Sequence, residues 1–272
     1  MTVEIHARDT EVQSRSIPAH PKVHILGSHV DLIDLEDAVA LIQGWIMARD
    51  GQCRQVVVSG FHALWEAHCN PAFRRMVNSA DLWLPDGIAP IWLARMHRLR
   101  AVARIPGAEL MDALLAKADM AGYRSFFYGD TEETLTRLTE ALRNKYHGHR
   151  IVGTLSPPFR ALTPEEDEEH VRRINEANPD ILWVGLGTPK QDRWISEHRD
   201  RLKVPVAIAV GAAFRFLSGQ TERAPAWLGR AGLEWAYRLA KEPKKCWRRC
   251  LVQGPQFLIH AVLELIGVRR YE

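Results

Sequence analysis

The chain has 272 residues, of which 46% are hydrophobic and 25% are charged, and its net charge is only +3. Length and composition fit one large globular domain with or without a small appendage, and the small net charge does not suggest a polyelectrolyte. The four cysteines lack the C-x-x-C spacing of zinc sites, which favours a reducing cytosol. The polar start predicts a flexible leader over residues 1–20 without a signal peptide, and no run reaches the ~18 apolar residues of a membrane span.

Apolar periodicity predicts strands and helices that alternate along the chain. This alternation predicts an α/β, Rossmann-like fold with a largely parallel sheet and helices on both faces. The pattern changes after Gly219, so we divide the chain into a catalytic domain at 21–220 and a basic, helical appendage at 221–272. The expected strands lie at 23–33 (a pair), 54–60, 80–87, 124–130, 150–155, 180–187 and 204–214, and the expected helices at 35–48, 62–68, 71–79, 88–97, 109–123, 131–146, 163–177 and 190–202.

The appendage carries most of the charge imbalance. Between residues 222 and 249 there are eight Lys or Arg residues and three Glu residues. Such an excess suits phosphate groups or an anionic membrane surface, although a solvated helix face is the simpler reading. Trp and Tyr side chains interleave with these cations, and segment 255–270 is apolar with basic ends. Both features predict a membrane-proximal appendage, with packing on the domain as the alternative.

Several expected strands end in residues suited to ligand binding, and ligands of open parallel sheets bind at these strand ends. Asp86 directly follows a strand, where a carboxylate can accept the proton of an attacking hydroxyl; a plain turn aspartate is the alternative. Gly185 and Gly187 precede Lys190 and Gln191 at a helix start, a setting in which backbone N–H groups can meet phosphate. Gly129 offers similar backbone geometry, and for both turns a tight connection without a ligand is the alternative.

The sequence offers little for a metal ion. His62 and His68 lie six residues apart on one expected helix, which is poor spacing for a shared metal, so we expect surface or packing roles for them. No D-x-D pair of the kind that holds a metal-bound nucleotide sugar occurs. We therefore expect neither a metal ion nor a cofactor.

Five segments together resemble the WecG/TagA/CpsF glycosyltransferases over roughly residues 23–250. They are ADLWLPDGIAPIW (80–92), RIPGAEL (104–110), YGDTEET (128–134), DILWVGLGTPKQDRW (180–194) and the long segment from VGAAFRF to KCWRR (210–249). The resemblance implies an inverting transferase that moves a sugar from a UDP-sugar to a polyprenyl-diphosphate-linked saccharide. The transferred sugar would be N-acetylmannosamine, glucose or a related sugar, in cell-surface or exopolysaccharide synthesis. The implied place is the cytoplasm, peripheral on the inner face of the membrane.

The resemblance also assigns residues. The family's proposed catalytic base falls on Asp86, and its P-K-Q motif includes Lys190 and Gln191. Its three C-terminal arginines, which meet a diphosphate, fall on Arg238, Lys245 and Arg248, where lysine keeps the charge but loses the bidentate fork. A Thr-x-Asn motif of the family is not retained, and Ser59 supplies a hydroxyl one position away, so the sugar stays open. The expected substrate-binding set is Ser59, Arg104, Gly129, Gly185, Gly187, Lys190, Gln191, Arg223, Arg238, Lys245 and Arg248.

Two other functions are weighed against this one. A dinucleotide-dependent oxidoreductase predicts G-x-G-x-x-G after the first strand and an acid about 20 residues later, and neither occurs near Gly27. A non-enzymatic nucleic-acid binder using the basic appendage predicts steeply salt-dependent binding. We expect no nucleic-acid partner, and the oligomeric state, a homo-oligomer included, stays open.

Overall fold

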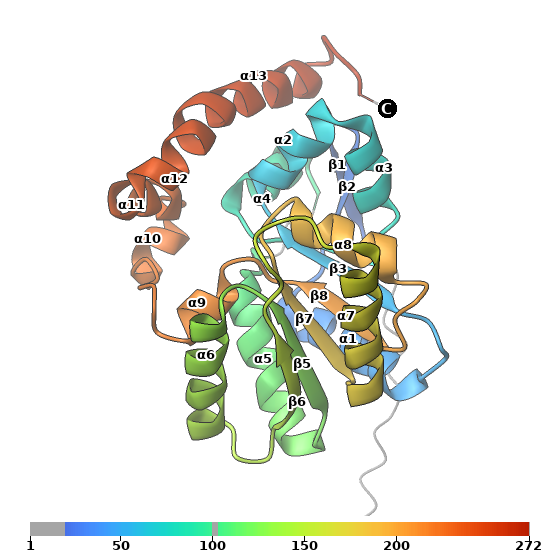
Figure 1. Cartoon of the computed structure of the whole chain (residues 1–272). Coiled ribbons are helices and arrows are strands. Elements are labelled where there is room, and N and C mark those ends of the chain that lie inside the picture. Colours follow the sequence, from blue (N-terminus) through green and yellow to red (C-terminus); the bar gives the residue numbers. More distant parts are fainter. Residues whose placement is uncertain (1–19, 100–102, 272) are drawn as a thin grey trace, which may run out of the picture.

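A six-stranded parallel sheet forms the centre of the protein (Figure 1). The computed structural model describes residues 20–99 and 103–271, so most of the predicted leader at 1–20 lies outside the described residues. A two-stranded antiparallel hairpin, β1 (Lys22–Ile25) and β2 (Ser28–Asp31), precedes the sheet, as predicted. The strand order of the sheet is β4 (Leu82–Pro85), β3 (Arg54–Ser59), β8 (Val206–Ala209), β7 (Ile181–Gly185), β5 (Arg124–Gly129) and β6 (Arg150–Leu155).

Helices cover both faces of the sheet, which confirms the predicted α/β architecture. Side chains alternate between the faces of a strand, so Val56 and Val58 point into one hydrophobic cluster while Val57 points into another. One face packs on α1 (Leu35–Ala48), α5 (Gly107–Ala121), α6 (Glu132–Lys145) and α9 (Ala213–Leu217). The other packs on α2 (Phe61–Cys69), α3 (Pro71–Asn78), α4 (Ile88–Met96), α7 (Pro164–Ala177) and α8 (Lys190–His198).

Local side chains set the ends of several helices. Asp34 caps α1 by accepting a hydrogen bond from the Asp37 backbone N–H. Thr163 and Glu166 form a reciprocal capping box at the start of α7. Such caps satisfy backbone donors that lack partners within the helix. The crossover helices are therefore defined at their starts by short-range sequence signals.

One predicted element is wrong in its second half. The strand expected at 204–214 ends at Ala209, and residues Ala213–Leu217 form α9 instead. Gly211 lies between them with φ +56°, a left-handed conformation that ends an extended strand and suits glycine. The apolar run continues past this turn because α9 is also packed in the core, so apolar composition alone hid the change.

The C-terminal segment forms an arm of short helices, which leaves the body after α9 and returns to it at α2 (Figure 1). Pro243 begins a new helix, so Arg238 and Arg248 lie on different elements rather than on one continuous helix. No helix in the described part of the chain is both long and apolar enough to span a membrane. The arm consists of α10 (Ala226–Arg230), α11 (Glu234–Lys241), α12 (Pro243–Trp247), the π-helix η1 (Arg248–Gln253) and α13 (Gly254–Leu265).

The last helix of the arm, α13, is anchored to the body on one side. Phe257 and Ala261 are buried in the cluster that includes α2, and the Glu264 carboxylate accepts a hydrogen bond from the Leu26 backbone N–H at 2.8 Å. The other side of α13 leaves large apolar side chains such as Ile259 and Val262 exposed. Packing on the domain and an exposed apolar face therefore occur together on this helix.

Candidate active site

Two adjoining cavities lie at the carboxyl ends of the parallel strands. The first, which we call the Asp86 cavity, has a volume of about 430 Å³ and includes Ser59, Asp86 and Gln191 in its lining. The second, the Asp130 cavity, has a volume of about 670 Å³. The two cavities share the lining residues Gly187, Gly211, Ala212, Phe216 and Arg238.

Asp86 lies where the ends of β3 and β4 meet. Its backbone N–H donates to the Ser59 carbonyl at 3.2 Å, and its carboxylate accepts from the Gly107 N–H at 3.3 Å. A side chain on Gly60 would lie 3.2 Å from the Gly87 nitrogen, so glycine at this point lets the two turns approach closely. The structure thus places Asp86 in a cavity wall, held by the backbone of a neighbouring segment.

The surroundings of Asp86 disfavour its ionised form on balance. Burial raises the pKa of the Asp86 carboxyl, and the nearby Glu234 carboxylate raises it further. The positive charges of Arg249 and Arg104 and the hydrogen bond from Gly107 act in the opposite direction. A carboxyl whose pKa is raised by burial holds a proton more readily, which suits a group that accepts a proton from a hydroxyl.

Gln191 is fully buried and joins two of the strand-end turns. Its side-chain oxygen accepts hydrogen bonds from the backbone N–H groups of Gly187 at 3.0 Å and Gly211 at 3.1 Å. These bonds tie the turn after β7 to the turn after β8. Gln191 therefore shapes the wall between the two cavities, and a direct role in binding substrate stays a prediction.

The predicted glycines have different surroundings. Gly129 lines neither cavity, and a side chain there would lie 2.6 Å from the Gly185 carbonyl carbon. A side chain on Gly185 would lie 2.7 Å from the Phe214 ring, and Gly185 lines the Asp130 cavity. Close packing thus accounts for the glycine at position 129. Because Gly129 lines neither cavity, its position does not support the predicted contact with a ligand.

Two of the predicted arm cations reach the Asp86 cavity. Arg238 lines both cavities, with its guanidinium 5.9 Å from the centre of the Phe216 ring. Arg248 lines the Asp86 cavity. Lys245 lies in α12, but its side chain is outside the described part of the structure. The arm therefore closes one side of the cavity with positive charge.

The two other predicted arginines form ion pairs near this cavity. Arg223 lines the Asp86 cavity and pairs with Glu109 at 2.8 Å. Arg104 pairs with Glu234 at 2.8 Å, and Glu234 itself lines the cavity. Arg104 is thus neutralised by a carboxylate that also acts on Asp86.

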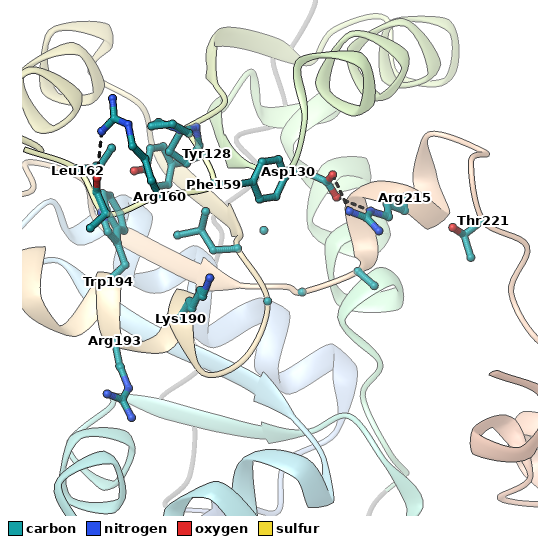
Figure 2. Close-up of a pocket in the computed structure, with 18 of the residues that line it drawn as sticks. Tyr128, Asp130, Phe159, Arg160, Leu162, Lys190, Arg193, Trp194, Arg215 and Thr221 are labelled. Atoms are coloured by element: carbon teal, nitrogen blue, oxygen red, sulfur yellow. Dashed lines mark hydrogen bonds and ion pairs between the residues drawn. The ribbon is translucent and has the colours of Figure 1, made fainter. Parts of the chain in front are cut away.

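Aromatic side chains line the Asp130 cavity (Figure 2). The ring of Tyr128 stacks on Trp194 at a centroid distance of 4.3 Å. Phe159 comes from the loop after β6 and is 83% exposed. The predicted Lys190 also lines this cavity, whereas Arg193 points away from its centre in Figure 2. An apolar, aromatic wall beside a cation suits a nucleobase joined to phosphate.

An ion pair occupies one wall of the Asp130 cavity, as the dashed lines in Figure 2 show. The Asp130 carboxylate accepts from Arg215 Nε at 2.8 Å and Nη2 at 3.0 Å. Burial opposes the ionised form of Asp130, but hydrogen bonds from Arg215 and the Thr131 backbone outweigh it and lower the pKa. This bidentate pair gives the wall a fixed polar group.

The residues of the Asp86 cavity that were not predicted include His62, Glu234, Arg249 and Gln253. Burial, reinforced by Arg249, lowers the pKa of His62 to about 4, so its imidazole is neutral at neutral pH. Arg249 is the sequence neighbour of a predicted residue, and the basic run was the signal that could have included it. Within residues 20–99 and 103–271, no group of three His, Cys, Asp or Glu side chains is arranged as a metal site.

Comparison with known proteins identifies the family of the chain. The model of the "Glycosyl transferase WecG/TagA/CpsF family" matches residues 23–271. An N-acetylglucosaminyldiphosphoundecaprenol N-acetyl-beta-D-mannosaminyltransferase of Bacillus spizizenii is 33% identical over 187 residues, 69% of this chain and 70% of the relative. One of the same name from Staphylococcus aureus is 28% identical over 243 residues, 87% of this chain and 91% of the relative. The chain therefore belongs to the WecG/TagA/CpsF family and is a glycosyltransferase.

Proposed function

We propose that the protein transfers a sugar from a UDP-sugar to a saccharide linked to a polyprenyl diphosphate, with inversion at the anomeric carbon. One observation carries the proposal: the Asp86 carboxylate and the guanidinium groups of Arg238 and Arg248 line a single cavity at the carboxyl edge of the sheet. A base and a set of cations are what transfer from a diphosphate leaving group requires. The relatives' printed names, which describe a diphosphoundecaprenol substrate, support the acceptor class.

The donor nucleotide belongs in the Asp130 cavity. Its aromatic wall suits the uracil ring, and the Asp130–Arg215 pair offers polar atoms to the ribose or the base. The diphosphate would then lie at the wall shared with the Asp86 cavity, beside Gly187 and Arg238. At this boundary the donor sugar would project toward Asp86, where the acceptor binds.

In the proposed reaction, Asp86 accepts the proton of the acceptor hydroxyl. The hydroxyl oxygen forms a bond to the anomeric carbon on the face opposite the nucleotide, and the bond from that carbon to the UDP oxygen breaks. Arg238, Lys245 and Arg248 stabilise negative charge on a diphosphate, either that of the departing UDP or that of the lipid acceptor. Each such contact stabilises the transition state by about 3 kcal/mol.

The transferred sugar is N-acetylmannosamine, glucose or a related sugar, and the product serves cell-surface or exopolysaccharide synthesis. The relatives' printed names favour N-acetylmannosamine. Ser59, whose hydroxyl accepts from Trp83 Nε1 at 3.2 Å, lies in the part of the cavity where a sugar would bind. A screen of UDP release over several UDP-sugars with a synthetic polyprenyl-diphosphate N-acetylglucosamine identifies the donor.

The substitution Asp86→Asn tests the base. We expect turnover to fall by about 10²- to 10⁴-fold, whereas UDP binding measured by calorimetry stays within about twofold because the amide keeps the shape of the carboxyl. Asp200→Asn, an exposed carboxyl outside both cavities, is the matched control. Near-normal turnover in the Asp86 variant removes this residue from the mechanism.

The protein would act from the cytoplasm, peripherally on the inner face of the membrane where a lipid-linked acceptor lies. The exposed apolar side of α13, with Ile259 59% and Val262 48% exposed, together with the cations of the arm, suits the interface of an anionic bilayer. The double substitution of Ile259 and Val262 by Glu should abolish co-flotation with phosphatidylglycerol vesicles. Met120→Glu, at an apolar residue on α5 that is 84% exposed, is the control, and equal loss in both variants contradicts docking through α13.

A further inference from the structure

The π-helix of the arm brings an additional cation to the Asp86 cavity. In a regular helix successive side chains diverge by about 100°, so neighbouring residues seldom face one site. Within η1, however, Arg248, Arg249 and Gln253 all line the Asp86 cavity. Single π-helical turns within helices frequently occur at functional sites. Arg249 is thus aimed at the same space as Asp86.

Packing on the body holds the side chain of Arg249 in place. Its guanidinium lies 5.4 Å from the centre of the Phe61 ring at the start of α2. Phe61 in turn contacts Phe257 of α13, with the ring centroids 5.8 Å apart. A cation over an aromatic face is stabilised and restricted in orientation. The position of Arg249 therefore depends on the arm being packed against α2.

Arg249 differs in its pairing from two other cations near Asp86, Arg104 and Arg223. Arg104 is bound to Glu234, and Arg223 is bound to Glu109. In the described part of the chain no carboxylate forms an ion pair with Arg249. Arg249 and Asp86 act on each other electrostatically, each favouring the charged form of the other. The charged and titratable groups that line this cavity are Asp86, His62, Arg223, Glu234, Arg238, Arg248 and Arg249, and Arg104 acts on Asp86 from its ion pair.

We propose that Arg249 is a positioning residue that favours the ionised form of Asp86 when the arm is packed on α2, so that Asp86 can accept the acceptor proton. Glu234 is the opposing group, because its negative charge disfavours an ionised Asp86. The side chain of Arg249 thereby couples the docking of the arm on α2 to the ionisation of Asp86. This inference rests on the proposed role of Asp86 as the base.

The dependence of kcat/KM on pH tests this role, because activity rises with pH as the base ionises. Arg249→Met should move this rise to higher pH and lower kcat/KM at neutral pH by about tenfold or more. Arg249→Lys, which keeps the charge, should rise close to the wild-type pH. Glu234→Gln should move the rise to lower pH. Lys244→Met removes one exposed positive charge from the arm outside both cavities and should leave the profile unchanged.

Opposite shifts from two cavity substitutions would not arise from a merely structural role of these residues. Any of three results overturns the inference. The rise of kcat/KM with pH does not move in Arg249→Met, or it is displaced as far in Arg249→Lys as in Arg249→Met, or it does not shift to lower pH in Glu234→Gln. Asp86→Asn in the same assay separates the two proposals. If that variant is active, the proposed base is wrong. If it is inactive while the Arg249→Met profile is unmoved, only the role of Arg249 fails. Should Arg249→Met fail to fold, Arg249→Lys and Glu234→Gln still decide.

Discussion

Replacement of Gly129 by alanine tests the close approach of β5 and β7 that forms the edge of the Asp130 cavity. Gly129 pairs directly with Gly185 across the two strands. An added Cβ would lie 2.6 Å from the Gly185 carbonyl carbon and 2.7 Å from its oxygen. These are backbone atoms of a buried central strand, so they cannot move aside as the end of a flexible side chain would.

The expected loss of stability has two sources. Gly129 has φ +121°, and an L-residue held in such a backbone region costs about 1–3 kcal/mol. Forcing an extra carbon into a packed core costs about 1–3 kcal/mol more. The sum of about 2–6 kcal/mol is a large part of the roughly 5–15 kcal/mol by which a domain is stable. Gly129→Ala should therefore unfold at a much lower urea concentration.

Urea unfolding followed by circular dichroism measures this loss. The control is Gly44→Ala in α1, where a Cβ meets nothing within 4 Å and the helical position favours alanine by about 0.5–1 kcal/mol. The two glycine substitutions should thus change stability in opposite directions. A Gly129→Ala protein within about 0.5 kcal/mol of wild type, the usual range for neutral surface changes, would refute the packing argument.

Three further predictions concern buried acid and the Asp130 cavity. Burial raises the pKa of the Asp192 carboxyl from 3.8 to about 7. The stability that the folded protein has with a neutral Asp192 is therefore present in full below pH 3.8 and is lost as pH rises through about 7. Three pH units at about 1.4 kcal/mol each give roughly 4 kcal/mol, so Asp192→Asn should be more stable than wild type by up to that amount at pH 8 and not at pH 4 in urea unfolding. Phe159→Ala should weaken UDP binding about tenfold in calorimetry through lost stacking without lowering the melting temperature, and an unchanged Kd would contradict the placing of the donor. Arg215→Met should also raise the Kd for UDP about tenfold, because Asp130 loses its bidentate partner; retained affinity would show that this pair does not serve the nucleotide.

Part of the site could be predicted because it depends on short-range signals. Asp86 directly follows an apolar strand, and the carboxyl ends of parallel strands share one edge, so its place near a cavity followed from the sequence. The β8 prediction ran too long because α9 continues the apolar run beyond Gly211. Phe159 has no local signal, since its loop contributes to the site only through the position of β6 at the edge of the sheet.

The sequence by itself determined the succession of elements, because apolar periodicity, caps and glycine turns act over a few residues. Only the tertiary structure decided which strand ends meet. β8 lies between β3 and β7, which sets the Ser59 turn, beside that of Asp86, next to the Gly211 and Gly187 turns and makes two cavities share a wall. The return of the arm to α2, which brings Arg249 to Asp86, depends on contacts such as Phe61 with Phe257. These contacts join residues nearly 200 positions apart, and local propensities carry no information about pairings at that range.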